Sequence, residues 1–342
     1  MSMKEEQLLL KRNLGYDNKN TAERKKIFDF SEGYKDILNY AKTERRFVKK
    51  TVEILEEAGF KPFSRKQALK EGDKVYFVNR GLSLAAAIIG SSSLKDGVHL
   101  VASHVDSPRL DLKPIPLYET DGMLYIKTHY YGGIKKYQWT SIPLCLMGTV
   151  SLKNGKTVEV SIGEDKDDPV FVIADLLPHL GKNQMKKTLD EGVEAEQLNA
   201  IGATIPYDDE EAKEKIKLNF VNLLYQKYKI TEADLISADL ALVPQMEARD
   251  TALDRSLIAA YGQDDRICAY ASLKAFLDSK PSSHTKVLYL ADREEVGSMG
   301  NSGTQAGFLK YTLEELAEKM NCKIRDVLSN TACLSADVCA AY

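Results

Sequence analysis

Carboxylate and imidazole side chains follow four strand-like runs of this 342-residue sequence, each at the point where the apolar residues end. They are His104 and Asp106 in SHVDS, Asp264 and Asp265 in GQDDR, Glu294 and Glu295 in ADREEVGS, and Asp337 in LSADV. In open α/β sheets the carboxyl ends of the strands converge on one crevice, so these side chains can meet in space despite long separations along the chain. The sequence therefore predicts one shared site.

The residue types in these four places favour a metal site. One histidine with several carboxylates suits a divalent cation such as zinc, cobalt or manganese. Two cations need a carboxylate that bridges them, and a hydrolase also needs a base that is not bound to metal. The adjacent acids Glu294 and Glu295 could divide those tasks. Each motif alone is also typical of a surface pair, a helix N-cap or a charged loop, so the prediction rests on their repetition at strand ends.

Two kinds of secondary-structure pattern, α/β and β-rich, alternate along the chain. The runs KVYFVNRG, LSLAAAIIG, GVHLVASHVDS and KVLYLADREEVGS are strand-like. Between about residues 110 and 200 the pattern indicates β-hairpins, because Asp121-Gly122 and Asn154-Gly155 lie between strand-like runs and accept the positive φ of tight turns. After about Ile236 the α/β pattern returns with the strand candidate ISADLALVP and the helix candidate RICAYASLKAFLDSK.

The simplest fold that fits these patterns is an α/β domain formed by residues 1–110 and 236–342, interrupted by a β-rich insertion over residues 111–235. Helical periodicity from Thr43 to Ala58 predicts a helix with Gly59 at its C-cap. A capping box of Thr312 and Glu315 predicts the start of a later helix.

The composition limits the classes of partner and the cellular compartment that we expect. A formal charge of −3 gives no reason to expect a nucleic acid or an anionic membrane as partner. The most apolar run, Leu82 to Gly90, is too short to cross a bilayer. The five cysteines form no CxxC pair and no signal peptide is visible, so we expect reduced thiols in a cytoplasmic protein.

The segments SHVDSPRLDLKP, DDRICAYASL, DREEVGS and SADVCAAY, in this order, resemble the M18 family of metallo-aminopeptidases, which includes the aspartyl aminopeptidases. The resemblance implies a mixed-sheet metallopeptidase domain with helices on both faces and an inserted dimerisation domain. It implies a hydrolase that uses two divalent metal ions, with zinc favoured over cobalt and manganese. Its implied substrates are peptides, from which it removes the N-terminal amino acid, an acidic one in the best-known members. It also implies homo-oligomers based on dimers, up to dodecamers.

The same resemblance implies a role for each residue. The implied metal ligands are His104, Asp265, Glu295 and Asp337. Asp265 resembles the carboxylate that bridges the two metals, with Asp264 as the alternative. Asp106 resembles the acid that orients the imidazole of His104, and Glu294 resembles the general base.

The sequence also departs from the family pattern. The pattern continues to a further histidine ligand, whereas this sequence ends at Tyr342, so we expect the family's C-terminal segment to be lacking. In the insertion, His179 stands alone where members have a histidine-rich stretch, with Asn183 near the place of the second histidine, and Cys339 replaces a histidine of many members. A site without its last ligand would bind metal weakly. The alternative function is therefore a catalytically inactive assembly module that keeps the fold.

Overall fold

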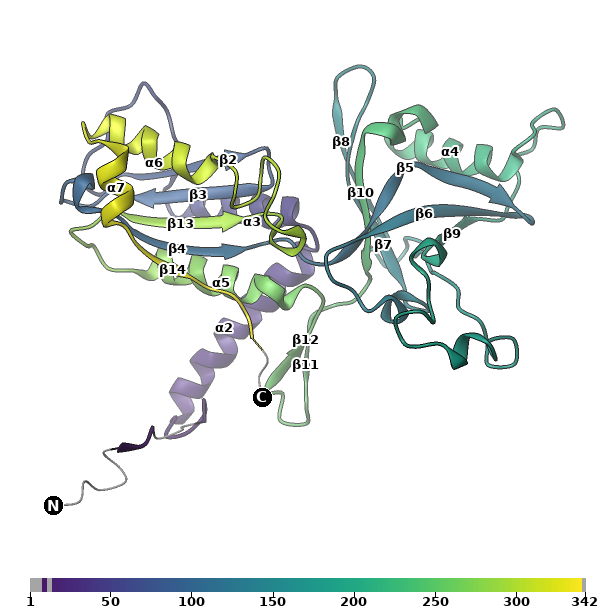
Figure 1. Ribbon diagram of the computed structural model, residues 1–342, viewed down its shortest axis with the longest axis horizontal. Coiled ribbons are helices and arrows are strands. Elements are labelled where there is room, and N and C mark those ends of the chain that lie inside the picture. Colours follow the sequence, from purple (N-terminus) through teal and green to yellow (C-terminus); the bar gives the residue numbers. More distant parts are fainter. Residues whose placement is uncertain (1–7, 11–13, 340–342) are drawn as a thin grey trace.

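A computed structural model describes residues 8–10 and 14–339 of the chain, which form two lobes, each built on its own sheet (Figure 1). The α-helices are α2 Thr21–Tyr40, α3 Glu44–Glu57, α4 Lys215–Tyr228, α5 Gln263–Asp278, α6 Phe308–Lys319 and α7 Ile324–Asn330. The strands are β1 Lys61–Pro62, β2 Lys74–Asn79, β3 Ser83–Ile88, β4 His99–His104, β5 Arg109–Thr120, β6 Met123–Tyr131, β7 Leu144–Ser151, β8 Thr157–Ile162, β9 Ala200–Ala203, β10 Ala238–Pro244, β11 Arg249–Thr251, β12 Leu257–Ala259, β13 Lys286–Ala291 and β14 Ala332–Ser335. No helix in these described ranges is both long and apolar enough to cross a membrane.

The first sheet is mixed and has the order β1-β2-β3-β13-β4-β14. Strand β13 runs antiparallel to β3 but parallel to β4, and β14 is also parallel to β4. The last residues of β13 and β4, Ala291 and His104, are register partners. Because three parallel strands end at one edge, the segments that follow β4, β13 and β14 meet there.

Helices cover both faces of this sheet, as predicted. In β3, Leu84 and Ala86 pack in one cluster with α2, α3 and α5, whereas Ala85 and Ala87 pack in another with α6 and α7. Successive side chains of a strand point to opposite faces, so a strand buried on both faces is apolar at every position. This explains the continuous apolar run around β3 and confirms the mixed α/β fold class.

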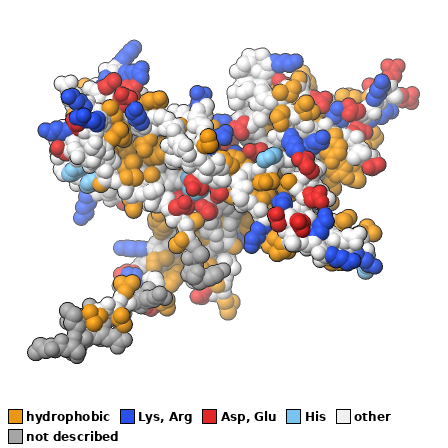
Figure 2. Space-filling view, in the orientation of Figure 1, with side chains coloured by type: hydrophobic (Ala, Val, Ile, Leu, Met, Phe, Trp, Pro, Cys, Tyr) orange, Lys and Arg blue, Asp and Glu red, His pale blue; other side chains and the backbone are white. Residues whose placement is uncertain are grey.

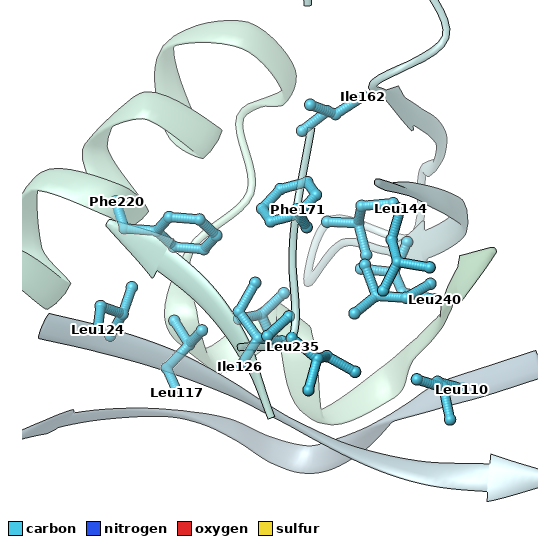
Figure 3. Packing of buried hydrophobic residues seen from close by; sticks show 14 of the residues in the cluster. Leu110, Leu117, Leu124, Ile126, Leu144, Ile162, Phe171, Phe220, Leu235 and Leu240 are labelled. Atoms are coloured by element: carbon cyan, nitrogen blue, oxygen red, sulfur yellow. The ribbon is translucent and has the colours of Figure 1, made fainter. Parts of the chain in front are cut away.

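The second sheet is antiparallel throughout and has the order β8-β7-β10-β5-β6-β9. The two predicted hairpins, β5–β6 and β7–β8, are both present, and Gly122 and Gly155 turn with φ of 75° and 82°. Helix α4 covers this sheet, and Figure 3 shows its Phe220 in the apolar cluster with Leu117 and Leu124 of the strands.

Two predictions about elements were wrong. The run ISADLALVP, predicted to return the chain to the α/β part, forms β10 and lies between β7 and β5 of the second sheet. A central strand reads as a continuous apolar run in either kind of sheet, so its sequence does not say which sheet it joins. The helix predicted to start near Thr312 already begins at Phe308, and Thr312 is buried within α6.

Charged pairs join the two lobes where the first turn of α3 meets the second sheet. Arg45 Nη2 lies 2.6 Å from Asp239 Oδ2 of β10, and Arg109 Nη1 of β5 lies 2.8 Å from Glu44 Oε2. The side chains of Glu44 and Arg109 are only 6% and 9% exposed. The second pair is therefore shielded from solvent, and its Arg109 follows the end of β4 at His104 by five residues.

Candidate metal centre

The predicted histidine ends β4 with its two ring nitrogens in different surroundings. His104 Nδ1 lies 3.2 Å from Asp106 Oδ1 and 3.1 Å from the Asp106 backbone oxygen. Nε2 faces carboxylates on the other side, at 3.3 Å from Asp264 Oδ1 and 3.8 Å from both Glu294 Oε2 and Asp337 Oδ1. A metal-binding histidine uses one nitrogen for the cation and donates a hydrogen bond with the other, and this ring is oriented in that way.

Asp106 is fully buried and accepts hydrogen bonds from three segments. Besides His104, its carboxylate accepts from the hydroxyl of Tyr131 at 2.7 Å and from the backbone amides of Glu294 and Glu295 at 3.2 Å each. One carboxylate thus connects the end of β4, the end of β6 and the loop after β13.

This pairing shifts both ionisation equilibria. Burial disfavours the charged imidazole, but the hydrogen bond and charge of Asp106 outweigh it and raise the pKa of His104 to about 9. Burial likewise acts against the charged carboxylate, yet the hydrogen bonds from His104 and Tyr131 hold the pKa of Asp106 below its ordinary value. Asp106 therefore remains an anion that accepts hydrogen bonds at neutral pH.

The two adjacent glutamates sit in a short 3-10 helix, η6 (Glu294–Val296), directly after β13. Arg293 before it and Gly297 after it have φ of 62° and 85°, so the chain turns sharply on both sides. These turns aim the first two amides of η6 at Asp106 and leave the two glutamate side chains on the side of the site.

The acids gather around His104 in two overlapping sets, and in each set the potential ligand atoms lie within 4.8 Å of one another. The sets are His104 with Asp264 and Glu295, and His104 with Asp265 and Asp337. The structure thus brings together all four predicted ligands and also the alternative, Asp264. Figure 2 shows acidic side chains gathered near the middle of the molecule, between the two lobes.

Asp265 provides the clearest test of whether a cation fits. It is fully buried, and neither carboxylate oxygen has a hydrogen-bond partner within the described part of the chain. Burial raises the pKa of Asp265 to about 6, and burial together with the charge of Asp264 raises that of Glu295 to about 7. An orphaned buried carboxylate beside other acids and an imidazole is a donor set that fits a divalent cation.

Glu294 differs from the other acids because it belongs to neither set, although its carboxylate lies 3.8 Å from His104 Nε2. Its side chain is 46% exposed, so water and substrate can reach it. A carboxylate beside a cation site but outside the ligand sets is positioned to accept a proton.

Sequence reasoning missed Tyr131, the last residue of β6 in the second sheet, and Gly132, which follows it. A Cβ at Gly132 would lie 3.1 Å from the Cβ of Glu295, and its φ is 73°. Glycine is needed here for both reasons, the close approach and the left-handed backbone. The doublet Gly132-Gly133 after an aromatic run was the available signal, but it is also typical of an ordinary turn.

Comparisons with known proteins identify the family and the fold of this chain. The family model described as aminopeptidase I zinc metalloprotease (M18) matches residues 37–342. A probable M18 family aminopeptidase 1 from Borrelia garinii subsp. bavariensis is 43% identical over 327 residues, covering 93% of this chain and 71% of that protein. The crystal structure of an M18-family aminopeptidase from Thermotoga maritima matches with a TM-score of 0.92 at 42% identity, covering 97% of this chain and 73% of that one. The mApe1 dodecamer of Saccharomyces cerevisiae shares the fold, with a TM-score of 0.73 at 24% identity, covering 93% of this chain and 73% of that one.

Proposed function

Because this chain belongs to the M18 family of zinc metalloprotease aminopeptidases, we propose that it hydrolyses the first peptide bond of peptides at the site around His104. One observation carries the proposal: a buried imidazole, an orphaned buried carboxylate and four further acids converge where β4, β13, β14 and α5 meet. The family match and this convergence favour a peptidase over a catalytically inactive assembly module.

We propose that two divalent cations, zinc before cobalt or manganese, occupy this site. The residues that would hold them are His104, Asp264, Asp265, Glu295 and Asp337, and Asp265, or Asp264 in its place, would be shared between the two cations. When bound, such cations supply a Lewis acid that polarises the scissile carbonyl and acidifies the attacking water. Asp106 keeps the imidazole of His104 oriented, because its hydrogen bonds hold Nδ1 away from the ligand side.

The proton transfers are assigned to Glu294. Its carboxylate removes a proton from the attacking water while the water oxygen bonds to the carbonyl carbon. When the carbon–nitrogen bond breaks, the same carboxyl group returns the proton to the leaving amine. The products are a free amino acid and a peptide shorter by one residue, and Glu294 is again a carboxylate at the end of the cycle.

Cleavage at the first residue follows from charge. The site places several carboxylates around a single histidine, and Asp264 and Asp337 are 56% and 53% exposed. Together with Asp106, Asp265, Glu294 and Glu295 they make six carboxylates, more negative charge than two divalent cations would neutralise. The site therefore still attracts the positively charged α-amino group of a peptide, which an internal peptide bond does not offer. Because the sequence resembles aspartyl aminopeptidases, an acidic first residue is the first class of substrate to test.

We further propose that the second sheet with α4 is the inserted unit and mediates self-association, as a dimer or a larger assembly such as the dodecamer known for mApe1. The unit starts with β5, near the predicted boundary at 110/111. We place its other end after Pro244 and not at 235, since β10 pairs with β5 and β7.

A cytoplasmic location is proposed because all five cysteines are free in the structure, which suits a reducing compartment.

The experiment is hydrolysis of a panel of aminoacyl and peptide substrates, acidic ones included, with zinc, cobalt or manganese supplied in turn. Wild type is compared with Glu294→Gln and with Glu57→Gln, a matched change at the exposed end of α3. We expect metal-dependent release of the first residue, lowered by a factor of about 10² to 10⁴ in Glu294→Gln and unchanged in Glu57→Gln. A wild-type chain that binds no metal and cleaves nothing would favour the inactive module instead.

A further inference from the structure

Tyr131 is the last residue of β6 and belongs to the second sheet, yet its side chain ends inside the first lobe. Only 8% of the residue is exposed, and its hydroxyl donates a hydrogen bond of 2.7 Å to Asp106 Oδ2. In the proposed mechanism Tyr131 is neither a metal ligand nor a substrate contact, but it contacts Asp106, the carboxylate that holds His104.

The ring of Tyr131 is fixed from its other side. The guanidinium of Arg109 lies over it, 4.0 Å from the ring centroid. Arg109 is itself buried and is held by Glu44 of α3 at 2.8 Å and by Asp111 of β5 at 2.7 Å. Cation–π contact with a guanidinium that is paired in this way leaves the ring little freedom. The hydroxyl is thus held in place from the second sheet and from the junction of the lobes.

The hydroxyl supplies a large share of the hydrogen bonding of its acceptor. Asp106 Oδ1 accepts from His104 Nδ1 and from the amide of Glu294, and Oδ2 accepts from the amide of Glu295 and from Tyr131. Without the hydroxyl, Asp106 Oδ2 would keep one donor at 3.2 Å. Because Asp106 is fully buried, bulk water could not replace the lost donor. A buried carboxylate that loses a donor either rotates towards another or remains unsatisfied, and both outcomes disturb the imidazole.

We infer that Tyr131 is a positioning residue for the metal centre: its hydroxyl fixes the carboxylate of Asp106, and through it the imidazole of His104 in the geometry that binds the cation. The inference rests on the proposed function, because it assumes that His104 Nε2 is a metal ligand. It also means that the second sheet, beyond any role in assembly, completes the support of the site in its own chain.

The test compares Tyr131→Phe with Tyr130→Phe, a matched loss of one hydroxyl at the neighbouring residue, which is 39% exposed. Zinc affinity is measured by competition with a chromophoric chelator, and kcat and KM are measured at saturating zinc. We expect Tyr131→Phe to bind zinc about 10-fold to 100-fold more weakly, the range for loss of a partner that orients a ligand, and Tyr130→Phe to match wild type. Wild-type zinc affinity in Tyr131→Phe would overturn the inference.

A double-mutant cycle shows whether the hydroxyl acts through Asp106. Asp106→Asn is measured alone and combined with Tyr131→Phe. If Tyr131 acts through this carboxylate, the second change adds little to the loss of zinc affinity in Asp106→Asn. Losses that multiply independently would overturn the inference.

A readout without metal completes the design. The ring nitrogens of His104 are followed by NMR in metal-free protein with labelled histidine, and the other four histidines report whether each variant is folded. We expect the His104 Nδ1 signal to move in Tyr131→Phe and to stay in place in Tyr130→Phe; an unmoved signal contradicts the inference. A wild-type protein with no zinc affinity and no cleavage would instead remove the proposed function, and that failure is visible before any substitution.

Discussion

The buried ion pair between Glu44 and Arg109 allows a quantitative prediction about the junction of the lobes. Glu44→Gln keeps the size of the side chain but leaves the Arg109 guanidinium without its buried counter-ion. Removing one partner of a buried pair costs about 3 to 5 kcal/mol of unfolding free energy. Arg109 keeps Asp111, but that carboxylate is 38% exposed and is screened by solvent. We therefore expect a loss at the lower end, about 3 kcal/mol.

The loss is measured by urea unfolding followed by circular dichroism, taking the free energy from the midpoint and slope. The control is Asp29→Asn, which breaks the exposed pair with Lys25, whose partners are 73% and 59% exposed. A pair of this kind, one helical turn apart, contributes only about 0.2 to 0.5 kcal/mol. Equal losses in the two variants would refute the reasoning.

A second variant separates the effect of the unpaired Arg109 charge from the effect of lost side-chain packing. Glu44→Gln combined with Arg109→Met removes both charges and keeps an unbranched side chain at the junction. Replacing a buried pair by apolar groups of similar size is often neutral, so we expect the double variant to be more stable than Glu44→Gln alone. A double variant less stable than Glu44→Gln would mean that the Arg109 guanidinium stabilises the junction mainly through its stacking on the Tyr131 ring and its pair with Asp111, and not through Glu44.

Three further predictions concern the site and the second lobe. The zinc content of Asp264→Asn is compared with that of Asp265→Asn. We expect the substitution of a bridging aspartate to remove both cations, whereas substitution of the other aspartate removes fewer. If both variants keep two cations, neither aspartate is a bridge. Gly132→Ala should lower the unfolding free energy by about 1 to 2 kcal/mol, because φ at this residue is 73°. It should also lower kcat/KM, because the added methyl would lie 3.1 Å from the Cβ of Glu295. Wild-type stability and activity in this variant would show that the turn adapts. Hydrogen bonds from Thr231, whose hydroxyl and amide both donate, hold the pKa of Asp234 below its ordinary value. A lowered folded pKa stabilises the protein above the unfolded pKa of about 3.9, and that stabilisation is lost as the pH falls through the folded value. The difference in unfolding free energy between wild type and Asp234→Asn should therefore shrink as the pH falls below the unfolded pKa, and a difference that does not depend on pH contradicts this.

Local patterns in the sequence were sufficient for several features. The hairpins at Asp121-Gly122 and around Gly155 depend on backbone torsions that a few adjacent residues control. The convergence of the acids was predictable because parallel strands must end at a common edge of the sheet, whatever the details of packing. The separation of roles between Glu294 and Glu295 was proposed from the same pattern, and the ligand sets include only the second of them.

Other features were decided only by contacts between residues far apart in the chain. Strand β10 is apolar enough for either sheet, and only its pairing with β5 and β7 assigns it. The environments of Asp264 and Asp265, one half-exposed and one fully buried, differ although the residues are adjacent. Tyr131 reaches Asp106 across the junction of the lobes, and no periodicity or motif encodes a contact of that kind. Ligand chemistry and local turns belong to single segments and can be read from them, whereas burial and the direction of a side chain are properties of the assembled sheets and helices.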